Sequence, residues 1–292
     1  MADRIADIVS EAQLRESYRK HATLAQLNRM WQYQERPESG LDNLLDMMAP
    51  DVIVRSPHLD VQGHDAMRAA LAKIPMNWKA AHVLKSWKIA VDDGRTELRA
   101  KLDYLTSGAM ASKAQASYFA SFGATDTLLP RLARIDVEQG EGQPGATFVD
   151  MFAEHRILST VHYFLALVEN PAREAEPFFE LLGEEFRLDY TFDPIATPNA
   201  FREWVAGPLS SVIASEHDIH SVACRDGGDG TYTAEVAMKS QAMFPDKSGA
   251  ISRNTQSWTL TDAIGERFPR ITEILIDRDS VVRFDTEGLQ TG

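Results

Sequence analysis

The sequence is short of cysteine, with Cys224 alone among 292 residues. A single cysteine cannot close an intrachain disulfide, and it cannot supply the thiolate cluster of a structural zinc site. The sequence also lacks an HExxH pair and an EF-hand loop, and the glycines at 227, 228 and 230 fit a hairpin turn better than a phosphate-binding loop. We therefore expect neither a metal nor a nucleotide cofactor.

Positive charge is scarce as well. The 30 lysines and arginines face 43 aspartates and glutamates, which gives a net charge of −13 and a pI near 5.1. Without a basic surface there is little attraction for phosphate groups, so we expect neither nucleic acid nor a membrane as a partner. No apolar run approaches the roughly 20 residues that span a bilayer, and residues 1–21 lack the apolar core of a signal peptide. These absences lead us to expect a cytoplasmic protein.

What the sequence does contain is the composition of packed globular domains, 44% apolar and 25% charged. A chain of 292 residues suits two domains if each has roughly 100–200 residues. Patterns in the first half recur in the second half, and the boundary between them falls near residue 150. The predicted domains are therefore residues 1–150, which include an N-terminal helix, and residues 151–292.

The evidence for two copies is a set of four stretches that recur in the same order. The matching pairs, with the offset in residue number, are 41–56 with 175–190 and 64–72 with 198–206 (134), 82–87 with 217–222 (135), and 129–139 with 268–278 (139). Few residues are identical, but the apolar positions agree throughout. One match could arise by chance, whereas four matches in order indicate two tandem copies of one domain.

Each copy has the pattern of helices followed by strands. Helices are expected at 14–34, 41–48 and 65–73, and again at 160–169, 176–182 and 199–206. In the second copy Phe186, Leu188 and Tyr190 alternate on one face of a strand, and turns at 91–94 and 226–230 separate the later strands. This order predicts an α+β fold of two tandem cone-shaped domains, each a strongly curved antiparallel sheet with helices on its concave face. The open end of such a cone is a common ligand site.

The opening of each half resembles the nuclear transport factor 2-like superfamily, and its SnoaL-like polyketide cyclase branch in particular. The resemblance is carried by LLDMMAPDVIVRSP with QGHDAMRAALA in the first half, and by FFELLGEEFRLDYTFDP with TPNAFREWVA in the second. That superfamily includes ketosteroid isomerase, scytalone dehydratase, polyketide cyclases, a dehydrochlorinase and non-catalytic binding modules, so the site must decide the function. The resemblance also suggests a homo-oligomer, since the exposed backs of such sheets often pair.

Two histidines, His82 and His217, occupy the same position of the repeat at the start of a strand. Dehydratases and dehydrochlorinases of the superfamily carry a catalytic histidine at about this place, and an imidazole suits proton transfer near neutral pH. In the dehydrochlorinase-like pattern, an aspartate near the end of the first helix orients that histidine. Glu35 and Glu169 stand there in this chain, 134 residues apart. The alternatives are strand histidines bonded to the backbone and glutamates solvated at a helix end.

A comparison with ketosteroid isomerase adds two tyrosines. Its base position holds Ser56 in the first half and Tyr190 in the second, so its aspartate mechanism does not transfer. Tyr163 matches its oxyanion tyrosine. A set of Tyr163, Tyr190 and His217 would suit a phenol or an enol, because a phenolic hydroxyl both donates and accepts hydrogen bonds. Tyrosines on an apolar face are also common as core residues that pack through their rings.

Further residues are candidates for binding substrate. Gln256 falls near the second oxyanion donor of ketosteroid isomerase, while Arg29 and Ala116 replace the tyrosine and this glutamine in the first half. His58 and His64 flank the expected mouth of the first cone and would contact a polar group of the substrate. Loop histidines of this kind are as often only solvated.

The predicted function is a cofactor-independent lyase, isomerase or cyclase that uses general acid–base residues on a small hydrophobic substrate, aromatic (phenolic) or polyketide-like. Dehydration or deformylation through a quinone methide would fit such a pocket. The alternative is a non-catalytic module that binds a small molecule or a protein, with one copy purely structural. The differences between the copies at Ser56 and Tyr190, and at Arg29 and Tyr163, favour a single working cone.

Overall fold

The computed structural model describes residues 9–73, 79–92, 95–108, 111–123 and 127–285. The chain forms two compact units that do not follow its order. What we call the first unit contains residues 22–159 and 264–267, and the second unit contains residues up to 21, 160–263 and from 268 onward. Each unit therefore includes part of a long helix from the other half of the sequence.

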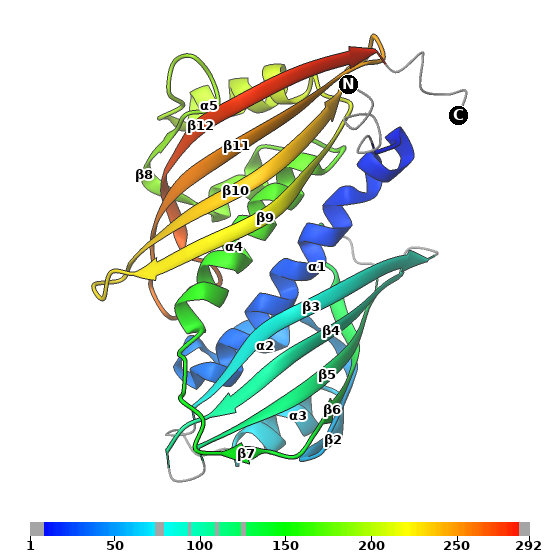
Figure 1. The fold of residues 1–292 in the computed structure, drawn as a ribbon, viewed down its shortest axis with the longest axis vertical. Coiled ribbons are helices and arrows are strands. Elements are labelled where there is room, and N and C mark those ends of the chain that lie inside the picture. The colour runs from blue at the N-terminus through cyan, green and yellow to red at the C-terminus, as the bar shows by residue number, and fades with distance from the viewer. Residues whose placement is uncertain (1–8, 74–78, 93–94, 109–110, 124–126, 286–292) are drawn as a thin grey trace. The chain divides into compact units, whose positions relative to one another are not determined.

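The first unit is built on a mixed sheet whose strands run in the order β2-β1-β6-β5-β4-β3, with β7 paired to β5. These strands are β1 (Met48–Ser56), β2 (Leu59–Gln62), β3 (Ala80–Asp92), β4 (Arg95–Thr106), β5 (Ser112–Gly123), β6 (Arg131–Gln139) and β7 (Gln143–Pro144). Its helices are residues 22–35 of α1 (Glu11–Glu35), the 3-10 turn η2 (Pro37–Ser39), α2 (Leu41–Asp46), α3 (His64–Leu71) and residues 152–159 of α4 (Phe152–Glu169). The sheet curves around the C-terminal part of α1 (Figure 1).

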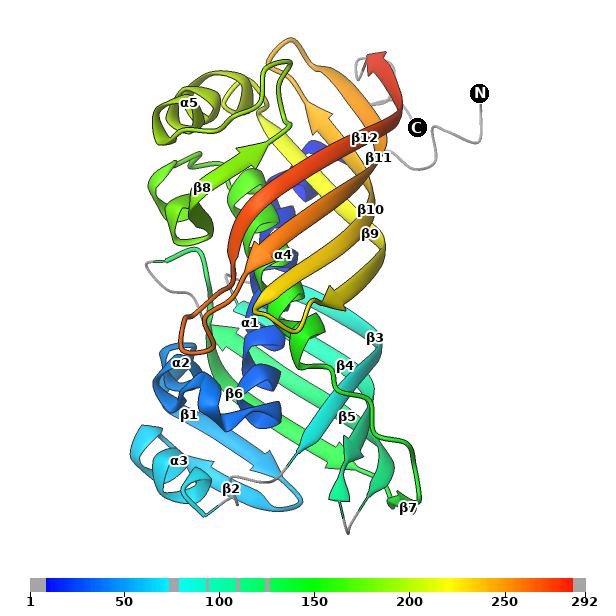
Figure 2. The ribbon, with the colours of Figure 1, turned by 90° about the vertical axis from the view of Figure 1, so that its left-hand side faces the viewer.

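The second unit has a sheet with the strand order β8-β12-β11-β10-β9. These strands are β8 (Leu182–Leu188), β9 (Ala214–Asp226), β10 (Thr231–Met243), β11 (Ser248–Thr261) and β12 (Arg270–Asp285). The helices are residues 11–21 of α1, residues 160–169 of α4, the 3-10 helix η4 (Glu176–Glu180), α5 (Pro198–Trp204) and the π-helical turn η5 (Val205–Leu209). Figure 2 shows β9 to β12 curving around α4.

Alternation along the strands makes one face of each sheet apolar. On β4 and β5 of the first unit nearly every second residue is buried, because successive side chains of a strand point to opposite faces. Leu98 and Leu102 of β4 join Leu27 and Trp31 of α1 in one hydrophobic cluster. Burial of such a side chain stabilises a fold by roughly 1.5–3 kcal/mol, so this packing holds the last turns of α1 against the concave face.

The α+β class and the two curved sheets with helices on their concave faces confirm the sequence-based prediction. Each sheet is antiparallel except for one parallel pair, β1 with β6 and β8 with β12. In both cases the first strand of a half is added beside its last long strand, which runs in the same direction. That extra strand widens the curved sheet beyond the four long antiparallel strands.

Some element boundaries differ from the prediction. Helix α4 begins at Phe152 and not at residue 160, and Asp150 accepts the Phe152 N–H at 3.0 Å. The prediction started too late because polar residues of the first turns hide the apolar pattern. Strand β8 ends at Leu188, whose backbone bonds to Ile195 at 2.9 Å, so Tyr190 lies beyond the strand. Across the described ranges, we find no helix with both the length and the apolar character needed to cross a membrane.

Candidate functional site

A buried carboxylate holds a histidine in the first unit. Glu35 is the last residue of α1 and is 3% exposed, and His82 lies near the start of β3 with no exposed surface. Glu35 Oε1 accepts the His82 backbone N–H at 2.9 Å and is 3.1 Å from its Nδ1. The ionised carboxylate only accepts hydrogen bonds, so His82 carries its proton on Nδ1 and leaves Nε2 as the basic atom.

A second histidine completes this cluster. His155, in the part of α4 that belongs to the first unit, places Nδ1 3.0 Å from Glu35 Oε2. Burial on its own raises the pKa of Glu35, but the charge of His155 and the hydrogen bonds from His155 and His82 bring it down to about 2. Glu35 is therefore ionised at neutral pH, and the solvated glutamate considered as an alternative does not apply.

Aromatic rings enclose His82. Trp31 stacks on its imidazole with 5.4 Å between the ring centroids, and Tyr104 and Tyr118 approach to 5.2 and 6.2 Å. Its Nε2 is buried and has no hydrogen-bond partner among the described residues. Burial lowers the pKa of His82 below its ordinary value, against the opposing effect of Glu35. The imidazole is therefore neutral and shut off from solvent.

The second unit repeats the pair at matching positions. Glu169, the last residue of α4, is fully buried, and its Oε1 accepts the His217 backbone N–H at 2.6 Å. The same oxygen lies 3.0 Å from His217 Nδ1. The side chain of His217 is 15% exposed, in contrast to that of His82. In the described part of the chain its Nε2 has no partner, so this basic atom is both free and closer to solvent.

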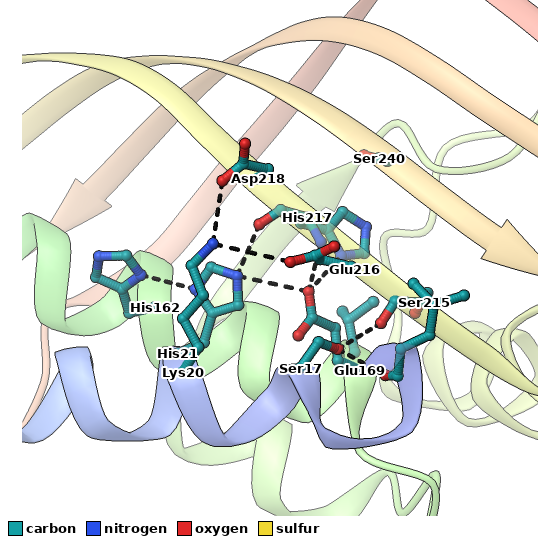
Figure 3. A network of polar contacts seen from close by, with 12 residues as sticks. Ser17, Lys20, His21, His162, Glu169, Ser215, Glu216, His217, Asp218 and Ser240 are labelled. Atoms are coloured by element: carbon teal, nitrogen blue, oxygen red, sulfur yellow. Dashed lines mark hydrogen bonds and ion pairs between the residues drawn. The ribbon is translucent and has the colours of Figure 1, made fainter. Parts of the chain in front are cut away.

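His21 and His162 extend the second cluster, which Figure 3 shows from close by. His21 Nε2 lies 2.8 Å from the carbonyl oxygen of His217 and 3.5 Å from Glu169 Oε1, and its Nδ1 lies 2.8 Å from His162 Nδ1. A carbonyl only accepts, so His21 donates from Nε2, and one of the two Nδ1 atoms donates to the other. Burial and the positive charges of His21 and Lys20 lower the pKa of His162 well below its ordinary value.

Glu169 is ionised for the same physical reasons as Glu35. Burial raises its pKa, while the charge of His21 and the hydrogen bonds from His21 and His217 lower it to about 2. Each unit thus holds a negative charge among imidazoles in a place that excludes water. Such a charge stabilises an imidazolium, and therefore makes the bonded histidine a better base.

The sequence analysis missed His21 and His155, although a signal for them existed. They are 134 residues apart, the offset that separates Glu35 from Glu169. We did not connect them to the pairs because each lies on the long helix of the opposite half of the sequence. The structure places His155 in the first unit and His21 in the second.

The two interiors differ in chemistry at matching positions. The register pairs His82 with Tyr104 on β4, and His217 with Ser240 on β10. Continuing one strand further matches β5 with β11, and the matched residues are Ala114 with Ser252, Ala116 with Asn254, Tyr118 with Gln256, and Ala120 with Trp258. The first interior is therefore aromatic and apolar, whereas the second carries hydroxyls, amides and an indole.

Gln256 is a buried residue of β11 that accepts a hydrogen bond from the Trp258 indole at 3.1 Å. It stands level with Tyr118 of the first unit, so its expected match with Ala116 is wrong by two residues. The hairpins of the two halves differ in length, and the four matched stretches do not locate the positions at which the offset changes. Burial raises the pKa of Tyr190, and the nearby Gln256 partly offsets this effect.

Two other predicted residues are occupied by packing or ion pairing. Tyr163 is a buried residue of α4 whose ring stacks on Phe268 with 4.9 Å between centroids. Arg29 is buried on α1, and its guanidinium lies 3.2 Å from the carboxylate of Asp46. Both contacts are of the kind that stabilises a fold, and the substrate contacts expected of these residues stay predictions.

The loop histidines of the first unit lie apart from the pair. His58 is exposed in the turn between β1 and β2, and His64 begins α3 with its Nε2 3.3 Å from the carbonyl oxygen of Met48. Neither forms a hydrogen bond with Glu35 or His82 in the structure. Among the residues that the structure describes, no group of three histidine, cysteine or acidic side chains could hold a metal ion.

Comparisons with known proteins find similarity at the level of the fold. No protein-family model and no curated protein matches the sequence. Similar solved structures include a candidate scytalone dehydratase from Novosphingobium aromaticivorans (8% identity, TM-score 0.40) and hexachlorocyclohexane dehydrochlorinase type 3 from Novosphingobium barchaimii (7%, 0.38). A nuclear transport factor 2-like superfamily protein from Salmonella enterica is similar too (9%, 0.40). Each match covers 45% of this chain and 87%, 88% and 94% of the respective neighbour. These neighbours are proteins of the nuclear transport factor 2-like fold.

Proposed function

We propose that this chain is a cofactor-independent lyase or isomerase in which His217, held by Glu169, removes a proton from a small hydrophobic substrate. The observation that carries the proposal is the hydrogen bond from His217 Nδ1 to a buried, ionised carboxylate, which leaves Nε2 free to accept a proton. The substrate class that we infer is aromatic (phenolic) or polyketide-like.

The two pairs are not equal, and this supports one working unit. His82 is fully buried and stacked on Trp31, so a substrate has no route to its Nε2 without displacing that packing. His217 is partly exposed, and the residue paired with it on β10 is Ser240. We infer that the first pair is structural and the second pair catalytic.

The chemistry that we infer needs a base, a hydrogen-bond acceptor that stabilises the protonated base, and a site with little water. His217 is the base and Glu169 is the acceptor. His217 Nε2 takes a proton from a carbon next to a carbonyl, or from a phenol, and the freed electron pair moves into the adjacent π system. In an elimination, the bond from the neighbouring carbon to its hydroxyl group breaks, and the hydroxyl leaves as water with the proton that the His217 imidazolium returns. Return of the proton to another carbon completes an isomerisation. In a deformylation, a phenolate first expels a benzylic hydroxyl group as water and becomes a quinone methide. His217 then takes the proton of a hydroxymethyl group, whose C–C bond breaks to release formaldehyde, and the electron pair restores the phenolate.

A base that acts on carbon is tested without knowing the natural substrate. 5-Nitrobenzisoxazole loses one proton and opens its N–O bond to give a coloured cyanophenolate, and needs no cofactor. His217→Asn keeps an amide N–H near the position of Nδ1 and removes Nε2, so we expect the rate with this probe to fall at least about 10²-fold. His82→Asn is the matched control and is expected to keep the rate within twofold.

The paired variants also distinguish the alternatives. Equal rates for His217→Asn and the unchanged protein would remove His217 from the proposal. Loss of activity in His82→Asn alone would move the working site to the first unit. A non-catalytic binding module would raise its melting temperature with ligands and return them unchanged.

The relation between the two halves is a further part of the proposal. We propose that the halves are tandem copies of the nuclear transport factor 2-like fold, in its SnoaL-like branch. The support for this is the recurring order of elements and the four matched stretches. A cytoplasmic location and a homo-oligomeric assembly stay predictions.

A further inference from the structure

A line of hydrogen-bonded side chains crosses the interior of the second unit. The Trp258 indole Nε1 donates to Gln256 Oε1 at 3.1 Å, Gln256 Nε2 donates to Asn254 Oδ1 at 3.2 Å, and Asn254 Nδ2 donates to Ser240 Oγ at 3.4 Å. The first three residues are buried, and Ser240 is half-buried. The line thus runs from the core toward the more open end of the site.

The indole at its buried end sets the direction of the whole line. An indole N–H can only donate, so the oxygen of the Gln256 amide must face it. The Gln256 NH₂ group then faces Asn254, which must present its oxygen, and the Asn254 NH₂ group therefore faces Ser240. This order establishes which end of each side-chain amide is the oxygen and which is the nitrogen. It makes Ser240 Oγ an acceptor and leaves the Ser240 hydroxyl proton free to be donated elsewhere.

The free end of the line lies beside the proposed base. Ser240 and His217 are directly opposite in the register of β10 and β9, and Figure 3 shows both residues at this place. Side chains of directly paired residues lie on the same face, with Cβ atoms about 4.5–5.5 Å apart. Among the described residues, Ser240 has no hydrogen bond other than the one from Asn254. A ligand atom bonded to His217 is therefore within reach of the Ser240 hydroxyl.

We propose that Ser240 donates a hydrogen bond to an oxygen of the substrate, a carbonyl or a phenolate oxygen, while His217 removes the proton. The proposal rests on the proposed function of His217. Negative charge develops on such an oxygen when a proton leaves, and a fixed donor aimed at it speeds the step. Donors in a line also polarise one another, so Ser240 is a stronger donor than an isolated serine.

The first unit lacks this arrangement. Tyr104 stands at the position of Ser240, and the positions of Asn254 and Trp258 hold Ala116 and Ala120. Alanine can neither accept nor donate through its side chain, so no line of this kind can form there. Tyr104→Phe, which removes one hydroxyl at the matching place, is therefore a matched control for Ser240→Ala.

The test measures binding separately from turnover. The binding probes are 4-nitrophenolate and 4-nitroacetophenone, which present a phenolate and a carbonyl oxygen, and affinity is followed by absorbance. We expect Ser240→Ala to weaken at least one probe about 10-fold and to slow the 5-nitrobenzisoxazole reaction by a similar factor, because its product is a phenolate. Ser240→Thr, which keeps the hydroxyl, should restore both values to within about threefold, and Tyr104→Phe should change neither.

Each outcome decides a separate question. Weaker binding of the phenolate alone identifies phenols as the substrate class, and weaker binding of the ketone alone identifies carbonyl compounds. Unchanged affinity for both probes in a folded Ser240→Ala variant overturns the role of Ser240. If His217→Asn still abolishes turnover in that case, the proposed function stands without Ser240. If His217→Asn has no effect while Ser240→Ala weakens binding, the donor site stands and the catalytic role fails.

Discussion

Glu35→Ala is expected to lower the free energy of unfolding by about 3–5 kcal/mol, as loss of one partner from a buried ionic cluster does. The carboxylate accepts hydrogen bonds from the backbone N–H and Nδ1 of His82 and from Nδ1 of His155. Without Glu35 these donors stay buried and unpaired, and each costs about 1–3 kcal/mol. Unfolding in urea, followed by tryptophan fluorescence and far-UV circular dichroism, measures the change.

Glu154 provides the control for this prediction because it lies on the same helix as His155. Burial raises its pKa, and no hydrogen bond or ion pair of the described residues involves it. Glu154→Ala is therefore expected to change the unfolding free energy by less than about 1 kcal/mol. If Glu35→Ala were as mild as this control, the cluster would not stabilise the first unit and its assignment as structural would fail.

The sequence was sufficient to predict the fold class and the two pairs of residues that meet. Helical and strand periodicity identified most elements, and one matched stretch placed His82 and His217 at equivalent positions. Glu35 and Glu169 were named because they stand where the dehydrochlorinase-like pattern has its acid. The structure shows each glutamate bonded to its histidine. The resemblance to the dehydrochlorinase-like pattern suggested these contacts, because an acid near the end of its first helix orients the strand histidine.

The other site residues and element boundaries depend on tertiary packing, which the sequence pattern does not contain. His155 and His21 reach the pairs through long helices of the opposite half, and α4 begins before its apolar pattern does. The line ending at Ser240 depends on the register of β9, β10 and β11, which a shift of two residues in the sequence match concealed. The structure shows that the side chain of His217 is partly exposed and that of His82 is buried. Nothing in the sequence distinguished the two histidines in exposure.

Acidification is expected to destabilise the protein in two stages, and the first begins at pH 6.5. The folded-state pKa values of His82 and His162 are lowered from the ordinary 6.5. Below pH 6.5 the unfolded chain therefore binds more protons than the folded chain. Stability falls with falling pH by up to about 1.4 kcal/mol per pH unit for each histidine. Urea unfolding at pH 7.5, 6.5, 5.5 and 4.5 measures this slope.

The second stage belongs to the carboxylates. Glu35 and Glu169 have pKa values of about 2 in place of 4.5, so each contributes about 3 kcal/mol that is present above pH 4.5 and lost as the pH falls toward 2.

The double variant His82→Asn/His162→Asn separates the two stages, because asparagine can keep a donor near Nδ1 but does not titrate. We expect it to flatten the dependence between pH 6.5 and 4.5 and to leave the loss below pH 4.5 in place. An unchanged slope above pH 4.5 would show that other groups take up the protons. His82 and His162 would then not be neutral in the folded protein, and the protonation inferred for His82 would have to be revised.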